Sequence, residues 1–328
     1  MSIRKLALAM GFAAAAAFAT VSAEAQTELT FGHVGEPGSL FEASANHFAE
    51  VANAKLAGTG YSVATYGSSQ LGKDSELLSK LKLGTVDFAL PSSVMSSVAP
   101  EFGVFEMPYL VKDREHMKRI EAEVFWPQIA PAAEAQGFKV LAIWENGFRH
   151  ITNNVRPITV PDDLKGIKLR TPKGEWRVKM FQSYGANPTP MAFSEVFVAL
   201  QTGVIDGQEN PFAQITSAKF QEVQKYLSLT GHVYTPAYIT VGMNKFSSLP
   251  ENVQALLSEA AKETQAFVYE TAANLEVELL QVLKDGGMAV NDADKDAFVK
   301  ASAGIYEEFA TQVPGGKEMV DKALSLAN

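Results

Sequence analysis

Midway along the chain lies the stretch Gly166-Ile167-Lys168-Leu169-Arg170-Thr171-Pro172. It predicts a strand over 167–170 that Pro172 ends, because proline cannot donate a ladder hydrogen bond. Arg170 therefore stands at the carboxyl end of a strand, where ligands of open α/β sheets bind. A guanidinium there can bind a carboxylate through two N–H groups, or it can form a structural ion pair between domains. The residues alone leave both interpretations open.

Strand-like and helical patterns alternate on both sides of this stretch, which predicts α/β units with a largely parallel sheet. A first helix is expected after Ser39, which has capping-box spacing to Glu42. Further helices are expected over 75–83, 175–184, 194–202 and 250–283. The other expected strands are 29–33, 61–66, 86–90, 138–144, 148–152 and 238–243.

The length of 328 residues predicts two domains, because one domain usually has about 100–200 residues. Asn146-Gly147 is a turn signal between two expected strands, and we place the first domain crossing there. The helical pattern from Pro250 to Leu283 has no internal Gly or Pro. At 1.5 Å per residue this helix would be about 50 Å long, so we expect it to span both domains.

The composition excludes several classes of function. The chain has 37 Asp and Glu against 28 Lys and Arg, a net charge of −9. This excess of negative charge does not favour binding to nucleic acid or to anionic lipid, which basic surfaces bind. The absence of cysteine excludes disulfides, a catalytic thiolate, zinc–thiolate sites and iron–sulfur clusters. A packed hydrophobic core must therefore stabilise the fold.

The N-terminus has the three parts of a secretory signal peptide. Arg4 and Lys5 precede an uncharged apolar stretch from Leu6 to Val21, and Ala23-Glu24-Ala25 is an A-x-A cleavage site. The apolar stretch is shorter than the roughly 20 residues that span a bilayer. We therefore expect residues 1–25 to be cleaved and the mature chain to be exported.

Catalytic and metal-binding motifs are weak. The segment 67–74 has Walker A spacing but ends in Asp74, where Mg²⁺ requires Ser or Thr, so we interpret it as a loop that leads into a helix. The five histidines show no H-E-x-x-H spacing. Asp206 and Glu209 could form the acid pair of a hydrolase, although Asp206-Gly207 is also typical of a turn.

Three motifs resemble those of the substrate-binding proteins of TRAP transporters, the DctP family. They are the stretch 166–172, the run G-A-N-P-T-P-M-A-F-S-E-V over 185–196 and the run G-V-I-D-G-Q-E-N-P over 203–211. Similar segments follow the family order at 66–72, 81–90, 105–109 and 244–250. The resemblance covers nearly the whole mature chain.

The resemblance implies an α/β fold in the form of a two-lobed periplasmic binding protein clamshell with a long interdomain helix. Residues 26–146 plus about 235–275 would form lobe I. Residues 147–234 plus about 276–328 would form lobe II. The cleft between the lobes would close on a small organic acid.

The resemblance also assigns site residues by motif. Arg170 of the L-R-x-P motif would grip the substrate carboxylate, and Arg149 would add a second contact. Asn210 would contribute a hydrogen bond and Phe193 an apolar contact. Two further positions match residues near the ligand, namely Lys173 and Ser92.

The function that the resemblance implies is that of an extracytoplasmic solute receptor, not an enzyme. It would bind a small organic acid in the periplasm and deliver it to the small and large TRAP membrane subunits for ion-driven import. Glu209-Asn210-Pro211 matches the metal-free pattern of the family, so we expect no metal and no cofactor. Two alternatives are a receptor for a related anion such as a sulfonate, and a secreted hydrolase that uses Asp206 and Glu209.

Overall fold

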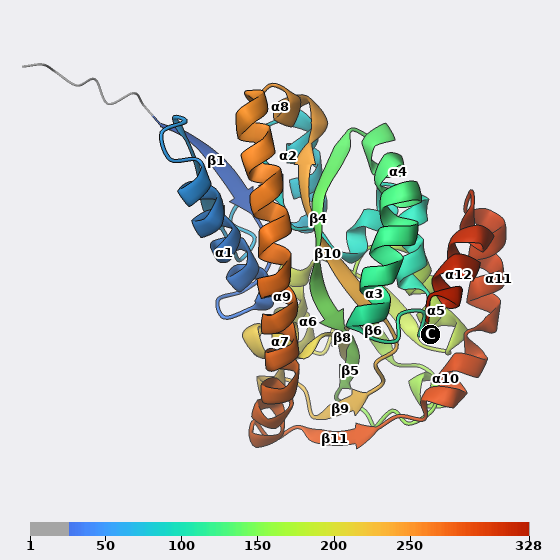
Figure 1. Ribbon diagram of the computed structural model, residues 1–328. Coiled ribbons are helices and arrows are strands. Elements are labelled where there is room, and N and C mark those ends of the chain that lie inside the picture. The colour runs from blue at the N-terminus through green and yellow to red at the C-terminus, as the bar shows by residue number, and fades with distance from the viewer. Residues whose placement is uncertain (1–25, 328) are drawn as a thin grey trace, which may run out of the picture.

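The computed structural model describes residues 26–327 and contains two β-sheets (Figure 1). The first sheet has five strands in the order β2-β1-β3-β10-β4, and the second has six in the order β11-β9-β5-β8-β6-β7. We call the first sheet with its covering helices the first lobe, and the second sheet with its helices the second lobe. The predicted signal peptide lies outside the described residues.

The first lobe contains a three-strand parallel unit joined to two long crossing strands. The parallel strands are β1 (Thr27–Gly32), β2 (Tyr61–Tyr66) and β3 (Phe88–Ala89), and the crossing strands are β4 (Phe138–Phe148) and β10 (Tyr234–Gly242). Its helices are α1 (Leu40–Lys55), α2 (Asp74–Leu83), α3 (Arg114–Ile120), α4 (Ala130–Ala135), α8 (Met243–Ser247) and α9 (Glu251–Asp285), with helical segments η1 (Ser93–Ser97), η2 (Pro100–Glu106) and η3 (Glu121–Ile129).

The second lobe contains shorter strands. They are β5 (His150–Asn153), β6 (Lys168–Thr171), β7 (Asn187–Pro190), β8 (Gly207–Asn210), β9 (Tyr226–Leu229) and β11 (Ala289–Asp292). Its helices are α5 (Glu175–Ser183), α6 (Val196–Gln201), α7 (Phe212–Ser217), α10 (Lys295–Ala301) and α11 (Ala303–Gln312), with helical turns η4 (Pro161–Leu164), η5 (Phe193–Glu195) and η6 (Phe220–Glu222). The last helix, α12 (Gly316–Ser325), follows α11 and packs against η2 and η3 of the first lobe.

The five helices expected from the sequence are present as α1, α2, α5, α6 and α9, with the predicted ends within two residues; the other helices were not predicted from the sequence. Ser39 caps α1 by accepting a hydrogen bond from the backbone N–H of Glu42 at 3.1 Å, as the capping-box spacing predicts. Gly84 ends α2 in the left-handed conformation with φ of 69°. The apolar stripe of α1 is buried because it packs against β2 and α9.

Two expectations about the strands are wrong. Asn146-Gly147 does not form a turn; β4 continues through it to Phe148, because β10 pairs with β4 there, for example Gly147 with Thr235. Gly147 adopts φ of +121°, a conformation that glycine tolerates without strain. The sheets are also mixed rather than largely parallel. In the first sheet β10 runs antiparallel to β3 and β4, and in the second β5 runs antiparallel to β8 and β9.

The long helix α9 covers 35 residues and runs along both lobes (Figure 1). It packs against α1 and β4 of the first lobe and against α7 of the second. Its buried face is narrow and rich in alanine, with Ala260 and Ala261 fully enclosed, so neighbouring elements approach the helix closely. The lobes therefore share a connection of two crossing strands and one continuous helix.

The two lobes also touch through contacts that do not involve α9 or the crossing strands. Lys73 Nζ of the first lobe lies 2.6 Å from Glu195 Oε1 of the second, in an exposed ion pair. Gly103 of η2 contacts the indole of Trp176 in α5 so closely that a Cβ at this glycine would lie 2.5 Å from the ring. The residue bounds expected for the two lobes remain a prediction.

Candidate functional site

A cavity lies between the lobes and encloses about 390 Å³ of space, part of it open to solvent. The first lobe and its crossing strand contribute Val34, Phe41, Asp74, Ser92, Ser93, Val94 and Asn146 to its wall. The second lobe contributes Arg149, Arg170, Pro172, Phe193, Asn210 and Gln214. The wall combines apolar side chains with a few polar groups from both lobes, which is typical of small-molecule sites.

The structure brings most of the sequence-predicted site residues together. Ser92, Arg149, Arg170, Phe193 and Asn210 all line the cavity. The exception is Lys173, which is exposed and lines an adjoining hollow. Because Arg170 and Asp74 line both spaces, the hollow adjoins the cavity on that side.

Arg170 stands at the end of β6 with its side chain in the cavity wall. It is 3% exposed, and its Nε and Nη2 both donate to the carbonyl oxygen of Met191, at 3.1 and 2.7 Å. Among residues 26–327 it has no carboxylate partner, so the structural ion pair that the sequence left open does not form. Burial lowers the pKa of Arg170 to about 10, which leaves it charged at neutral pH. Arg170 is thus a buried cation available to an anion.

Most of the N–H donors of the Arg149 guanidinium are hydrogen-bonded to other groups of the protein. Its Nε lies 2.5 Å from Glu209 Oε2, and its Nη2 donates to Glu209 Oε1 at 2.9 Å and to Asn210 Oδ1 at 3.0 Å. Asn210 in turn donates through Nδ2 to Gln208 Oε1 at 2.6 Å. Within the described part of the chain, Nη1 of Arg149 has no protein partner. This guanidinium is therefore fixed on one side and free on another.

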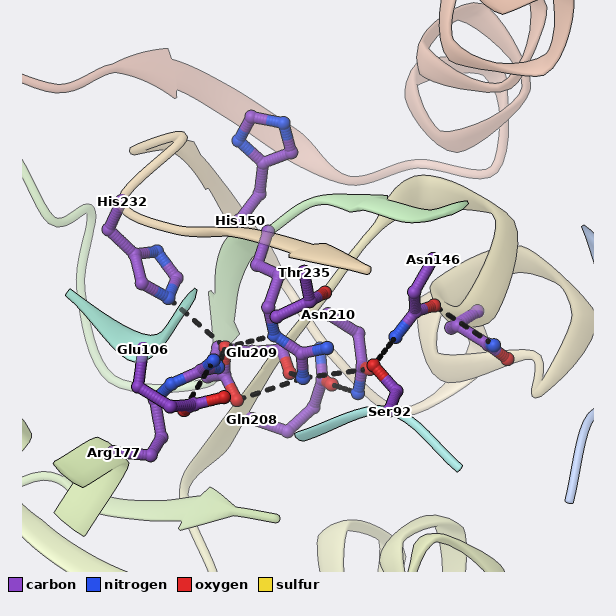
Figure 2. A network of polar contacts seen from close by, with 12 residues as sticks. Ser92, Glu106, Asn146, His150, Arg177, Gln208, Glu209, Asn210, His232 and Thr235 are labelled. Carbon is purple, nitrogen blue, oxygen red and sulfur yellow. Dashed lines mark hydrogen bonds and ion pairs between the residues drawn. The ribbon is translucent and has the colours of Figure 1, made fainter. Parts of the chain in front are cut away.

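Glu209 is the centre of a buried ionic cluster that includes Arg149, Arg177, Glu106 and His232 (Figure 2). Arg177 donates through Nη1 to Glu209 Oε2 at 2.7 Å. Its Nη2 lies 2.8 Å from Glu106 Oε2 as an ion pair whose N–H is not aligned with the oxygen. Two arginines and two carboxylates balance the formal charge, which makes their burial tolerable.

The surroundings of Glu209 keep it ionised. Burial alone would raise its pKa, but the charges of Arg149 and Arg177, with hydrogen bonds from His232 and Arg149, outweigh that effect and hold the pKa below its usual range. Burial lowers the pKa of His232 to about 4, so its ring is neutral at neutral pH and donates from Nε2 to Glu209 at 3.1 Å. Glu209 therefore serves as a fixed anion and not as a proton-transfer group.

Sequence reasoning missed four polar residues in the cavity wall: Asp74, Ser93, Asn146 and Gln214. Gln214 Nε2 donates to Asn146 Oδ1 at 3.3 Å, and Asn146 Nδ2 donates to Ser92 Oγ at 3.2 Å (Figure 2). Ser92 Oγ donates to the carbonyl oxygen of Pro236 at 2.6 Å. No sequence signal marks these positions as ligand contacts. Asn146 and Gln214 meet because β4 crosses between the lobes beside α7.

Metal and membrane signals are absent from the described part of the chain. Within residues 26–327, no three His, Cys, Asp or Glu side chains are gathered as a metal site would require. Across the same range, no helix combines the length and the apolar character that crossing a membrane requires.

Comparison with known proteins identifies the family. Residues 31–312 match the model for the bacterial extracellular solute-binding proteins of family 7, DctP. The chain belongs to this family. The family is one of periplasmic, substrate-binding receptors of TRAP transporters, so the protein is a receptor and not an enzyme.

Similar proteins bind different organic acids. The 2,3-diketo-L-gulonate-binding periplasmic protein YiaO of Escherichia coli is 32% identical over 98% of this chain and 98% of its own. A TRAP solute-binding protein from Polaromonas with bound D-erythronate is 33% identical, with a TM-score of 0.87 over 91% of this chain and 98% of its own. A TRAP solute-binding protein from Sulfurospirillum deleyianum with bound succinate is 29% identical, with a TM-score of 0.87 over 92% of this chain and 99% of its own.

Proposed function

We propose that this receptor binds a small organic acid through its carboxylate in the cavity between the lobes, with Arg170 as the principal cation. One observation carries the proposal: Arg170 is a buried guanidinium that bonds only to a neutral carbonyl within the described residues. Leaving a charge buried and unpaired is costly, so a bound anion stabilises the site. The other predicted residues act around it, with Arg149 and Phe193 in the wall and Lys173 in the adjoining hollow.

The loaded receptor would deliver its ligand to the small and large TRAP membrane subunits for ion-driven import. Export after cleavage of residues 1–25 would place it in the periplasm, where the family acts. The lobes would comprise 26–146 plus about 235–275 and 147–234 plus about 276–328, with the ligand between them. Contacts from both lobes give the ligand a means of selecting the closed arrangement.

The alternative of a hydrolase is disfavoured by the surroundings of both acids. Glu209 is enclosed by Arg149, Arg177 and His232, so it has no proton to exchange at neutral pH. Asp206 accepts from the backbone N–H of Lys168 at 2.8 Å and is not part of the cavity wall. A sulfonate would satisfy Arg170 as well as a carboxylate does, so the test includes both anions.

A thermal-shift screen against an organic-acid library with matched sulfonates tests the proposal. A ligand at 100 times its Kd stabilises the native state by about 2.7 kcal/mol, which is readily seen as a rise in Tm. We expect at least one carboxylate to raise the Tm and to be recovered unmodified. The proposal is wrong if no acid of the library binds or if a sulfonate binds more tightly than its matched carboxylate.

A further inference from the structure

Among the described residues, the charged side chains of the cavity wall and of the cluster beside it are paired with one another except at Arg170 and Asp74. Arg149 and Arg177 share the carboxylates of Glu209 and Glu106, so this cluster of four is neutral. Arg170 has no such partner among residues 26–327 and can neutralise one carboxylate of a ligand. A second carboxylate on the same ligand would enter the cavity without a buried cation of its own, which is costly.

Asp74 faces the same space from the first lobe. It is the first residue of α2, is half-buried, and lines both the cavity and the adjoining hollow together with Arg170. Its carboxylate has no hydrogen bond or ion pair to another described residue. Burial raises the pKa of Asp74 to about 6, although the charge of Arg170 opposes this. At pH 7.5 it is mostly ionised, so it repels a second ligand carboxylate and accepts hydrogen bonds from hydroxyl groups.

The lysines near Asp74 do not change this balance. Lys73 is paired with Glu195 across the lobe contact at 2.6 Å. Lys173 lines the hollow but is exposed, so water screens its charge. Neither residue lines the cavity itself.

Two other polar atoms of the cavity wall are enclosed without a partner. Gln214 is 3% exposed and Ser93 9% exposed, and both residues line the cavity. The Gln214 Oε1 and Ser93 Oγ atoms form no hydrogen bond within the described residues. The amide nitrogen of Gln214 already donates to Asn146, so its oxygen is an unused acceptor. Buried polar atoms are normally paired, which indicates that the ligand supplies hydroxyl groups here.

We propose that the ligand is a hydroxylated monocarboxylate, whose carboxylate binds Arg170 and whose hydroxyl groups hydrogen-bond to Asp74, Ser93 and Gln214. This inference rests on the proposed function, because it names the substrate class of the same site. An unsubstituted alkanoate leaves the three acceptors unpaired. A dicarboxylate brings a second charge toward Asp74.

Pairs of acids matched in carbon number test the proposal with the wild-type protein at pH 7.5. The pairs are glycerate and malonate, erythronate and succinate, xylonate and glutarate, and gluconate and adipate, with the unsubstituted alkanoate of each length and its 2-keto acid added. Calorimetry should give the tightest binding to a hydroxy acid, at least 100-fold tighter than its matched dicarboxylate. If a dicarboxylate, an alkanoate or a keto acid without hydroxyl groups binds most tightly, the substrate class is wrong and the proposed function stands. If no acid binds at any length, the proposed function itself fails.

Two variants assign the residues. Asp74→Asn keeps the size of the side chain and removes its charge, so it should narrow the preference for the hydroxy acid over the dicarboxylate by at least tenfold. Glu76→Gln is its matched control, because Glu76 lines the hollow but not the cavity. Gln214→Leu should weaken hydroxy-acid binding at least fivefold and leave the alkanoate unchanged. If Asp74→Asn and Glu76→Gln show the same preference for the hydroxy acid over the dicarboxylate, Asp74 does not contact the ligand as proposed. If Gln214→Leu binds the hydroxy acid as tightly as wild type, Gln214 does not contact it.

Discussion

Replacing Glu209 by glutamine should destabilise the protein strongly, although the two side chains have nearly the same shape. The Glu209 carboxylate is fully buried and accepts from Arg149, Arg177 and His232. The amide removes one negative charge from a cluster that is otherwise neutral, and its NH₂ group faces donors. Removing one partner of a buried ion pair costs about 3–5 kcal/mol, because the opposite charge stays buried.

Thermal and urea-induced unfolding measure this cost. A loss of 3 kcal/mol should lower the Tm by about 6 °C or more, given roughly 2–4 °C per kcal/mol for chains of 150–250 residues. Ligand affinity should fall as well, because Arg149 loses the carboxylate that fixes its guanidinium. Asp206→Asn is the matched control: it makes the same chemical change at a carboxylate 25% exposed, and the new amide oxygen can still accept from Lys168 N–H.

The comparison between the two variants decides the argument. Asp206→Asn should cost about 1 kcal/mol or less, as is usual for a hydrogen bond at a partly exposed site. If Glu209→Gln proves no more destabilising than Asp206→Asn, the buried ionic cluster does not contribute to the free energy of unfolding as its geometry indicates.

The remaining predictions concern the anion site, pH, closure and chemistry. Arg170→Lys keeps the charge but loses the planar guanidinium with its two parallel N–H donors, so affinity for the organic acid should fall at least tenfold, about 1.4 kcal/mol. Unchanged affinity by calorimetry would contradict the role of Arg170 as the carboxylate-binding group. Because the pKa of Glu209 is depressed in the folded state, its stabilisation is fully present above its ordinary pKa of 4.5 and decreases as the pH falls below that value. Unfolding between pH 5 and pH 3 should therefore be less pH-dependent in Glu209→Gln than in wild type. Ligand should reduce the radius of gyration by small-angle scattering and change the fluorescence of Trp176, which contacts Gly103 across the lobes; identical profiles would count against closure. After long incubation the ligand should be recovered in full and unmodified, and a product lost in Asp206→Asn would instead favour the hydrolase.

The sequence predicted the elements that local signals define. Ser39 and Gly84 act through neighbouring backbone groups, so their effect is visible within a few residues. At Asn146-Gly147 the local turn preference is real but weaker than the pairing of β4 with β10, whose partners are about 90 residues away. A tertiary interaction of that range leaves no mark in the local pattern.

Some residues of the candidate site could likewise be predicted from the sequence, and others could not. Arg170 and Arg149 were predicted because the sequence around each resembles a motif of the family. Asp74 was expected only to precede a helix, yet its carboxylate faces the cavity. Gln214 belongs to no motif and reaches the cavity only because α7 packs beside the crossing strands. Its contribution could not be seen without the three-dimensional arrangement.

The division of charge between the two arginines explains how one site can be both rigid and ready to bind. Arg149 is neutralised in place by Glu209, so its orientation does not depend on a ligand. Arg170 keeps its charge unpaired among the described residues, so its free energy depends on whether an anion is present. Both arginines belong to the second lobe, whereas Asp74 and Ser93 belong to the first. A ligand that binds Arg170 through its carboxylate and the first lobe through its hydroxyl groups gains its second set of contacts only when the lobes are together. That differential affinity, and not the tightness of the carboxylate contact alone, is what can drive closure.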